Sequence, residues 1–388
     1  MIQRILAILA AALIIPDIYI YRMYIIRLTS SIFLRTFYFV PSLLLFIGII
    51  FLIFAVGGAF ISEHSRWVGW FTLTYFLFAL PKIIFMFCSL IGLPFKYTLQ
   101  CPQTPFVYTG LFLAIGIIGI ILYGSLIGKT RFEVKEVSYT SSKLPKAFDG
   151  YRIVQLSDIH IGSWEGNEKA MQNAVEKVNA LHPDLIVFTG DLVNNRADEL
   201  NGFQNILAKL KAKDGIYSIL GNHDYGPYYH WKTKSDQVKS LLELEERQQE
   251  MGWNLLNNSH DILHKGNDSI ALIGVENEGE PPFSQYGNLS KAMKGTDDMF
   301  QILLSHNPTH WRREVLPKSN IDLMLAGHTH AMQMAWGHHS PSSFVYPEWS
   351  GMYKEGNRSL YVNVGLGFVG IPFRFGAWPE ITVITLKR

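Results

Sequence analysis

Hydrophobic residues dominate the first third of the chain, where apolar runs are long and charges are scarce. About 20 consecutive apolar residues are needed to cross a bilayer, and four stretches reach that length: Ile5–Ile25, Phe37–Ile61, Trp67–Leu93 and Pro105–Ile127. A cleaved signal peptide fits poorly, because no small-residue cleavage site follows the first stretch and three more stretches come after it. We therefore expect residues 1–128 to form a four-helix transmembrane region of a multi-pass protein in the inner or cell membrane.

The remainder of the chain alternates between short apolar runs and amphipathic stretches. Five runs are short and rich in β-branched residues, which is typical of buried strands: Ile153–Leu156, Leu185–Phe188, Ile216–Leu220, Ile302–Leu304 and Leu323–Leu325. Helical spacing marks Asn167–Leu181, Phe203–Leu210 and Val238–Met251, and further strands are predicted at Phe132–Tyr139, Ser269–Val275, Tyr361–Val364 and Glu380–Leu386. We interpret residues 129–150 as a linker with a first strand and residues 151–388 as one α/β or α+β domain.

A polar group of residues closely follows each of the five runs. These groups are Ser157-Asp158-Ile159-His160, Gly190-Asp191, Gly221-Asn222-His223-Asp224, Ser305-His306 and Gly327-His328-Thr329-His330. In α/β sheets, ligands bind beyond the carboxyl ends of the strands. We therefore expect the five groups to gather at one edge of the fold.

The residue types in these groups indicate a metal site. They offer two carboxylates, four imidazoles and one amide as oxygen and nitrogen ligands, with no thiolate among them. Such a set suits Mn²⁺, Fe or Zn²⁺, and it exceeds what a single ion needs. Two metals about 3.5–4 Å apart that share a carboxylate are a known device for in-line displacement at phosphorus. The sequence therefore predicts two divalent metal ions (Mn, Fe or Zn).

The five groups resemble, in type and order, the D-x-H, GD, GNH[DE], H and GHxH blocks of the calcineurin-like metallophosphoesterase family, over roughly residues 150 to 388. The resemblance implies a four-layer αββα sandwich, in which helices cover two mixed sheets. It also implies a phosphodiesterase-like hydrolase that uses a solvent-derived nucleophile activated by the metals. Carried over residue by residue, it implies this ligand set: Asp158, His160, Asp191 and His330 at the first metal, Asn222, His306 and His328 at the second, and Asp191 bridging both.

Two residues beside these ligands are implied to be catalytic. His223 matches the non-ligand histidine that contacts the phosphate and protonates the leaving oxygen. Asp224 is expected to orient or charge-balance His223, which is a usual way to fix an imidazole tautomer.

The membrane-attached branch of this family looks most similar, and it includes bacterial phosphodiesterases that act as UDP-2,3-diacylglucosamine pyrophosphatases. The last block of that branch reads GHTHGGQ, whereas Ala331 and Met332 replace the glycine pair here. We expect a bulkier pocket wall beside intact metal ligands. The expected reaction is cleavage of a phosphodiester or pyrophosphate bond in a substrate that is lipid-linked.

Two other functions are compatible with the sequence. One is a phosphomonoesterase acting on soluble substrates, and the other is a non-catalytic membrane sensor or scaffold with a vestigial metal site. Nucleic acid is a poor partner: the first 128 residues hold seven of the 34 Lys+Arg and two of the 32 Asp+Glu, which leaves the rest slightly acidic, and phosphate-backbone binding requires positive charge. The bilayer and a phosphoester substrate are the expected partners, and the oligomeric state stays open.

Aromatic residues cluster in two places after the first strand group. Tyr225, Tyr228, Tyr229 and Trp231 follow the Asn222 loop, and Phe368, Phe373, Phe375 and Trp378 gather near the end. These rings suit a lipid-accepting groove, the bilayer interface, where amphipathic rings are favoured, or ordinary loop packing. His338 and His339, just past the last block, suit substrate contact or a solvated loop.

Two charges, Asp17 and Lys82, lie inside predicted spans that run in the same direction. Intramembrane charges are usually paired or functional, so we predict an ion pair between them. The alternative is that Pro16 and Pro81 break the helices and both side chains reach the interface.

The side of the membrane that holds the second domain stays open, because positive residues divide almost evenly between the two sides: Arg22, Arg27, Arg35 and Lys96 on one, and Arg4, Arg66, Lys129, Arg131 and Lys135 on the other. The stretch Arg22–Phe37 is also compatible with an interfacial helix. Both cysteines, Cys88 and Cys101, lie in or beside the membrane, so disulfides within the second domain are excluded.

Overall fold

The chain folds into two compact units, which we describe separately. The computed structural model describes the backbone of residues 2–55 and 59–388 and the side chains of residues 7–55 and 60–388. Residues 1–127 together with 370–373 form the first unit, and residues 128–369 together with 374–388 form the second.

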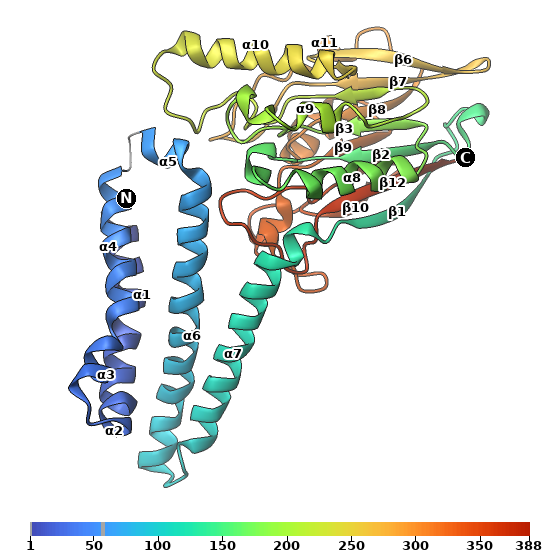
Figure 1. Ribbon diagram of the computed structural model, residues 1–388. Helices are drawn as coiled ribbons and strands as arrows, with labels where there is room; N and C mark the ends of the chain where they lie inside the picture. Colours follow the sequence, from blue (N-terminus) through green and yellow to red (C-terminus); the bar gives the residue numbers. More distant parts are fainter. Residues whose placement is uncertain (1, 56–58) are drawn as a thin grey trace. The chain divides into compact units, whose positions relative to one another are not determined.

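Apolar helices make up the first unit (Figure 1): α1 (Ile2–Ile20), a π-helical turn (Tyr21–Ile25), α2 (Ile26–Leu28), α3 (Ile32–Phe37), α4 (Val40–Ala55), α5 (Ala59–Glu63), α6 (Ser65–Thr98) and α7 (Thr104–Leu126). Four of these segments are long and apolar enough to cross a membrane: Ala7–Leu28, Ile32–Ala55, Ser65–Thr98 and Thr104–Thr130. The four predicted spans are thus confirmed, although the second begins at Ile32 rather than Phe37. Residues 56–58 of that predicted span and the side chain of Arg4 lie outside the described part of the chain.

An ion pair connects α1 to α6 inside the first unit. Lys82 Nζ lies 2.7 Å from Asp17 Oδ1 and donates to Ser42 Oγ of α4 at 2.8 Å. The Asp17 side chain is almost fully buried. The predicted pair is therefore confirmed. The alternative is wrong, because Pro16 and Pro81 lie inside α1 and α6 rather than at helix breaks.

Replacing Lys82 with methionine should destabilise the first unit by about 3–5 kcal/mol, the usual effect of breaking a buried ion pair from one side. Asp17 would keep only the Tyr38 hydroxyl, which donates to Oδ1 at 3.1 Å. We expect a lower melting temperature in detergent for Lys82→Met and a substantial recovery in the Asp17→Asn/Lys82→Met double variant, which removes both charges. Lys96→Met, in the last turn of α6, is the control. Unchanged melting of Lys82→Met would mean that the pair contributes nothing.

Two six-stranded sheets form the centre of the second unit. The first has the order β1 (Glu133–Thr140), β12 (Glu380–Lys387), β2 (Arg152–Leu156), β3 (Leu185–Phe188), β4 (Ile216–Ser218) and β5 (Trp253–Leu255). The second has the order β10 (Gly351–Glu355), β11 (Arg358–Val362), β9 (Leu323–Ala326), β8 (Phe300–Leu304), β7 (Asp268–Gly274) and β6 (Ser259–Lys265). Strands β2, β3 and β4 are mutually parallel, as are β8 and β9. Their carboxyl ends therefore meet at one edge of each sheet.

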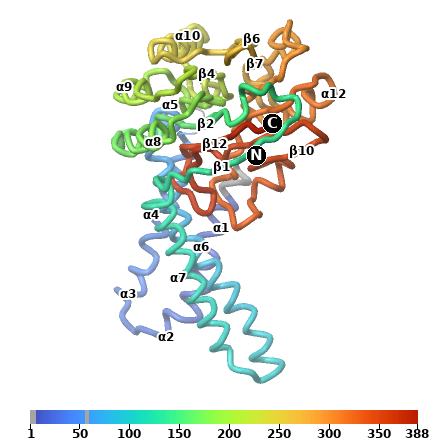
Figure 2. Tube along the Cα trace, turned by 90° about the vertical axis from the view of Figure 1, so that its right-hand side faces the viewer, coloured from blue at the N-terminus to red at the C-terminus, as the bar shows by residue number. Residues whose placement is uncertain are grey.

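Helices cover the outer face of each sheet. In Figure 2, α8 (Glu168–Ala180), α9 (Gln204–Leu207) and α10 (Lys234–Glu250) lie on one side of the strands, and α12 (Leu316–Lys318) lies on the other. The short helix α11 (Leu289–Ala292) belongs to the same apolar cluster as the outer face of the second sheet.

Alternation along the strands assigns each side chain to one of three apolar clusters. Ile153 and Leu185 pack between the sheets, whereas their neighbours Val154 and Ile186 pack against the helices of the first sheet. This follows from the period of two in a strand, and it explains why these strands are apolar on both faces. The predicted four-layer αββα sandwich is confirmed.

Several element boundaries differ from the sequence predictions. Helix α10 begins at Lys234, earlier than predicted, because Thr233 and Asp236 form a capping box: Thr233 Oγ1 accepts from the Asp236 N–H and the Asp236 carboxylate accepts from the Thr233 N–H. Helix α9 is only one turn long. Strands β5, β6 and β10 were not predicted, since they are short or only partly buried and lack an apolar run.

Candidate metal centre

The seven predicted ligands converge where five strands end. Asp158 and His160 follow β2, Asp191 follows β3, Asn222 follows β4, His306 follows β8, and His328 and His330 follow β9. Both sheets therefore contribute. All seven side chains are buried except His328, which is partly exposed.

Many of these residues have a left-handed backbone. Asp158, His160, Asp191, His328 and His330 have φ between 47° and 73°. Aspartate and histidine are found in this region more often than most residues, but it still strains any residue with a Cβ. Each turn follows immediately after the carboxyl end of a strand.

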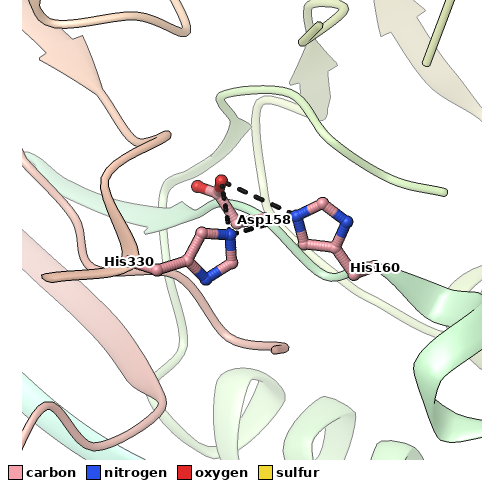
Figure 3. Close-up of side chains that lie close together, drawn as sticks. All are labelled: Asp158, His160 and His330. Carbon is pink, nitrogen blue, oxygen red and sulfur yellow. Dashed lines mark hydrogen bonds and ion pairs between the residues drawn. The ribbon is translucent and has the colours of Figure 1, made fainter. Parts of the chain in front are cut away.

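One group of ligand atoms comprises Asp158, His160 and His330 (Figure 3). His330 Nε2 lies 3.2 Å from Asp158 Oδ1 and 3.1 Å from His160 Nε2. Burial holds the pKa of both imidazoles below the usual 6.5, so neutral rings are favoured. Burial alone would raise the pKa of Asp158, but the neighbouring His330 and His306 together lower it. The group thus pairs a carboxylate with two neutral imidazoles.

The second group lies around Asp191. Its Oδ2 is 3.2 Å from His306 Nε2 and 3.5 Å from His160 Nε2, so one carboxylate oxygen faces both groups. His306 Nε2 is also 3.2 Å from His328 Nδ1 and 3.2 Å from Asn222 Oδ1. Although burial favours a neutral His306, Asp191 raises its pKa to about 9. A positive charge is therefore electrostatically favoured at this position.

Outer hydrogen bonds determine which ligand atoms point inward. His306 Nδ1 contacts the Thr189 carbonyl at 2.8 Å, which requires a proton on Nδ1 and turns Nε2 toward the cluster. His328 Nε2 contacts the Tyr346 hydroxyl at 3.1 Å, which directs Nδ1 inward. Such partners are the usual way in which metal-ligating imidazoles are oriented.

Asn222 is oriented in the same way. Its Nδ2 donates to the Tyr228 hydroxyl at 3.1 Å, so Oδ1 faces His306. Asn222 Oδ1, His306 Nε2 and His328 Nδ1 thus converge, with 3.2 Å from His306 Nε2 to each of the other two atoms, and these oxygen and nitrogen donors fit a divalent cation. The roles of Tyr228 and Tyr346 were not predicted, because both contacts depend on tertiary structure.

Arg374 is a further unpredicted neighbour of the ligands. The side chain is fully buried, and it donates to the carbonyls of Gly367, Val364 and Ala377 at 2.8–3.1 Å. Its Nη2 lies 2.9 Å from His330 Nδ1. This contact orients the ring, so that Nε2 faces Asp158 and His160. No local sequence signal marks this arginine.

His223 lies beside both groups, and with His160 and Asp191 it forms a third cluster of potential metal ligands. Its ring centroid is 4.7 Å from that of His160. Its Nδ1 contacts the Asn194 carbonyl at 2.7 Å, which fixes the proton on Nδ1. Glu199 in turn accepts from the backbone N–H of Asn194 at 2.6 Å and orders that loop.

The predicted role of Asp224 as the partner of His223 is wrong. Its two oxygens instead accept the backbone N–H groups of Asp191, Leu192, Val193 and Gly221 at 2.8–3.1 Å. Buried amides at two strand ends need an acceptor, and the carboxylate satisfies four of them. Burial raises the pKa of Asp224 to about 7. The residue organises the turns that carry the ligands.

The residues that replace the glycine pair also adopt left-handed conformations, with φ of 50° for Ala331 and 46° for Met332. Ala331 is fully buried, whereas Met332 is exposed. Among the predicted aromatics, Tyr225 donates to Glu276 and Phe368 packs against Trp164, which matches ordinary packing. His338 and His339 are exposed.

Comparisons with known proteins agree with this arrangement. A family model described as "Calcineurin-like phosphoesterase" matches residues 151–332, and one described as "Probable Calcineurin-like phosphoesterase, transmembrane domain" matches residues 3–129. The chain is 34% identical over 295 residues to "Uncharacterized metallophosphoesterase YkuE" of Bacillus subtilis, a match that covers 72% of this chain and 95% of that protein.

Two further relatives differ in length or in the activity for which they are named. The chain is 32% identical to a "Transmembrane protein with metallophosphoesterase domain" of Danio rerio, covering 69% of this chain but only 60% of that protein. It is 27% identical to "UDP-2,3-diacylglucosamine pyrophosphatase LpxG" of Chlamydia muridarum, covering 62% of this chain and 86% of that protein.

Proposed function

Because the chain belongs to the calcineurin-like phosphoesterase family and carries a transmembrane phosphoesterase domain, we propose that it hydrolyses a phosphodiester or pyrophosphate bond in a lipid-linked substrate. The observation that carries this proposal is the convergence of two carboxylates, four imidazoles and an amide in a buried cluster with His223 beside it. The activity for which LpxG is named supports an acylated pyrophosphate as the substrate class.

Two divalent ions, Mn, Fe or Zn, fit the ligand atoms. We assign the first to the group of Asp158, His160 and His330, and the second to the group of Asn222, His306 and His328, with Asp191 shared because its Oδ2 faces both. When bound, such a pair supplies an activated water and neutralises charge on phosphoryl oxygens.

His223 is the proton donor in this proposal. The Asn194 carbonyl holds its Nδ1–H, which leaves Nε2 as the atom that transfers a proton. Nε2–H would donate to the oxygen of the leaving group as its bond to phosphorus breaks. Positioned proton transfer of this kind typically contributes about 10²–10⁴-fold to the rate.

The test is hydrolysis by the full-length protein in detergent, with Mn²⁺ added. UDP-2,3-diacylglucosamine in mixed micelles is compared with UDP-glucosamine, which carries the same pyrophosphate without acyl chains, and with an aryl phosphomonoester. We expect metal-dependent turnover with kcat/KM at least about tenfold higher for the acylated pyrophosphate, since burying even two methylenes contributes about 1.6 kcal/mol and 1.36 kcal/mol is tenfold.

Two outcomes would overturn the proposal in different ways. If the soluble phosphomonoester is hydrolysed fastest, the proposal is wrong and the protein is better described as a phosphomonoesterase. Two bound metals per chain without turnover of any of the three substrates would favour the sensor or scaffold.

A further inference from the structure

An apolar surface segment begins next to the ligand His330. Of the nine large apolar side chains that are exposed among the described residues after Gly128, five lie within Met332–Val345, which we call the rim segment. Phe344 is 92% exposed, Trp336 69% and Val345 59%. The segment contains no Asp, Glu, Lys or Arg. Exposed apolar side chains concentrated in one segment are a feature of interaction sites.

Met332, at the start of the rim segment, combines a strained backbone with an exposed apolar side chain. Met332 has a φ of 46°, a conformation that costs an L residue roughly 1–2 kcal/mol and that glycine adopts freely. Its side chain nevertheless points to the surface and is 44% exposed. Met332 therefore combines a left-handed backbone with an apolar side chain that is not fully buried.

The rim segment is connected to the last membrane span by direct packing within the second unit. The candidate span Thr104–Thr130 includes Gly128, and a Cβ on Gly128 would collide with the carbonyl of Arg374. Phe375, the residue after Arg374, forms two backbone hydrogen bonds with the rim segment. Its N–H donates to the Gln333 carbonyl at 3.0 Å, and its carbonyl accepts from the Ala335 N–H at 2.9 Å.

Aromatic rings continue this connection. The Trp336 ring lies 5.9 Å from Phe375, and Phe375 lies 5.7 Å from Trp378. The Arg131 guanidinium lies 4.6 Å from the centre of the Trp378 ring. Tryptophan rings and basic side chains at the end of a span are typical of the membrane–water interface.

These observations point to one partner. We propose that the rim segment inserts Trp336, Phe344 and Val345 into the interfacial layer of the bilayer that the spans cross. Each polar headgroup layer is about 5–8 Å deep, and Gly128, which belongs to the candidate span by sequence, packs within the second unit against Arg374, the residue before Phe375. The inference concerns lipid contact by the rim segment, and it does not depend on the proposed reaction.

Lipid contact can be measured directly in the full-length protein. A fluorescent bimane is attached to Phe344→Cys in a Cys88→Ser/Cys101→Ser background, and the protein is reconstituted into phosphatidylcholine–phosphatidylglycerol vesicles. The matched control is Leu242→Cys, which replaces a 58% exposed leucine on the charged helix α10. Because both original side chains are exposed, neither label should disturb the core.

We expect lipids with doxyl-labelled acyl chains to quench the Phe344 label at least about threefold more than the Leu242 label, and aqueous iodide to show the reverse order. In vesicles without doxyl-labelled lipid, iodide quenching of the Leu242 label is the reference for full access to water. Equal iodide quenching at both positions, without excess doxyl quenching at Phe344, would overturn the inference. A Trp336→Cys label provides a second, independent position for the same comparison.

Discussion

Asp191→Asn should reduce metal-dependent turnover by about 10³-fold or more, because two metal ions contribute several kcal/mol to such reactions and each 1.36 kcal/mol is tenfold in rate. Asp191 is the one carboxylate whose oxygen faces both ligand groups, at 3.2 Å from His306 Nε2 and 3.5 Å from His160 Nε2. Its other oxygen accepts the His223 N–H at 2.8 Å. Asparagine keeps the shape but removes the charge that both groups share.

The measurement combines kcat on an aryl phosphodiester with the number of metal ions bound per chain. The control is Asp198→Asn, an exposed carboxylate paired with Arg196 on the same loop. We expect wild-type turnover and two metals in the control, and at most one tightly bound metal in Asp191→Asn. Two metals and near-normal turnover in Asp191→Asn would remove the bridging role assigned to this residue.

His223→Ala should lower kcat by about 10²–10⁴-fold while metal binding is retained. We expect this because Nε2, the nitrogen that the Asn194 carbonyl does not engage, is the proposed proton donor, and the proposed ligand set does not include His223. A leaving group that is acidic needs less protonation, so the loss should be small for a nitrophenyl ester and large for an alkyl ester. This leaving-group dependence separates proton donation from simple disruption of the site.

His338→Ala, which alters an exposed histidine beyond the last motif, is the control for this variant. It should leave both esters unaffected. An equal loss on nitrophenyl and alkyl esters, or loss of bound metal, would show that His223 acts on the structure of the site and not as an acid.

The sequence was informative about the ligands because each follows a short apolar strand. A strand buried on both faces must be apolar, so polar residues at its end are conspicuous, and parallel strands bring those ends to one edge. Asp158, Asp191 and His306 were recognisable for this reason. The presence of a second sheet was predicted from the family resemblance alone, since partly buried strands such as β6 carry no apolar run.

The residues that hold the ligands in place were beyond the reach of sequence patterns. Arg374 approaches His330 and Tyr346 approaches His328 only after the chain has folded. Asp224 lies next to His223 in the sequence, which suggested a pair, yet its carboxylate satisfies four backbone amides instead. The side chains of adjacent residues on a sharp turn can face opposite directions, and Asp224 faces away from His223.

The left-handed backbone at five ligand positions has a consequence for the history of the chain. Glycine would relieve roughly 1–2 kcal/mol of strain at each position, and proteins have so little spare stability that such gains are readily accepted when function does not oppose them. A chain relieved of its chemistry would therefore drift toward glycine at Asp158, His160, Asp191, His328 and His330. Carboxylates and imidazoles occupy all five, so the backbone strain is concentrated at the positions of the proposed metal ligands.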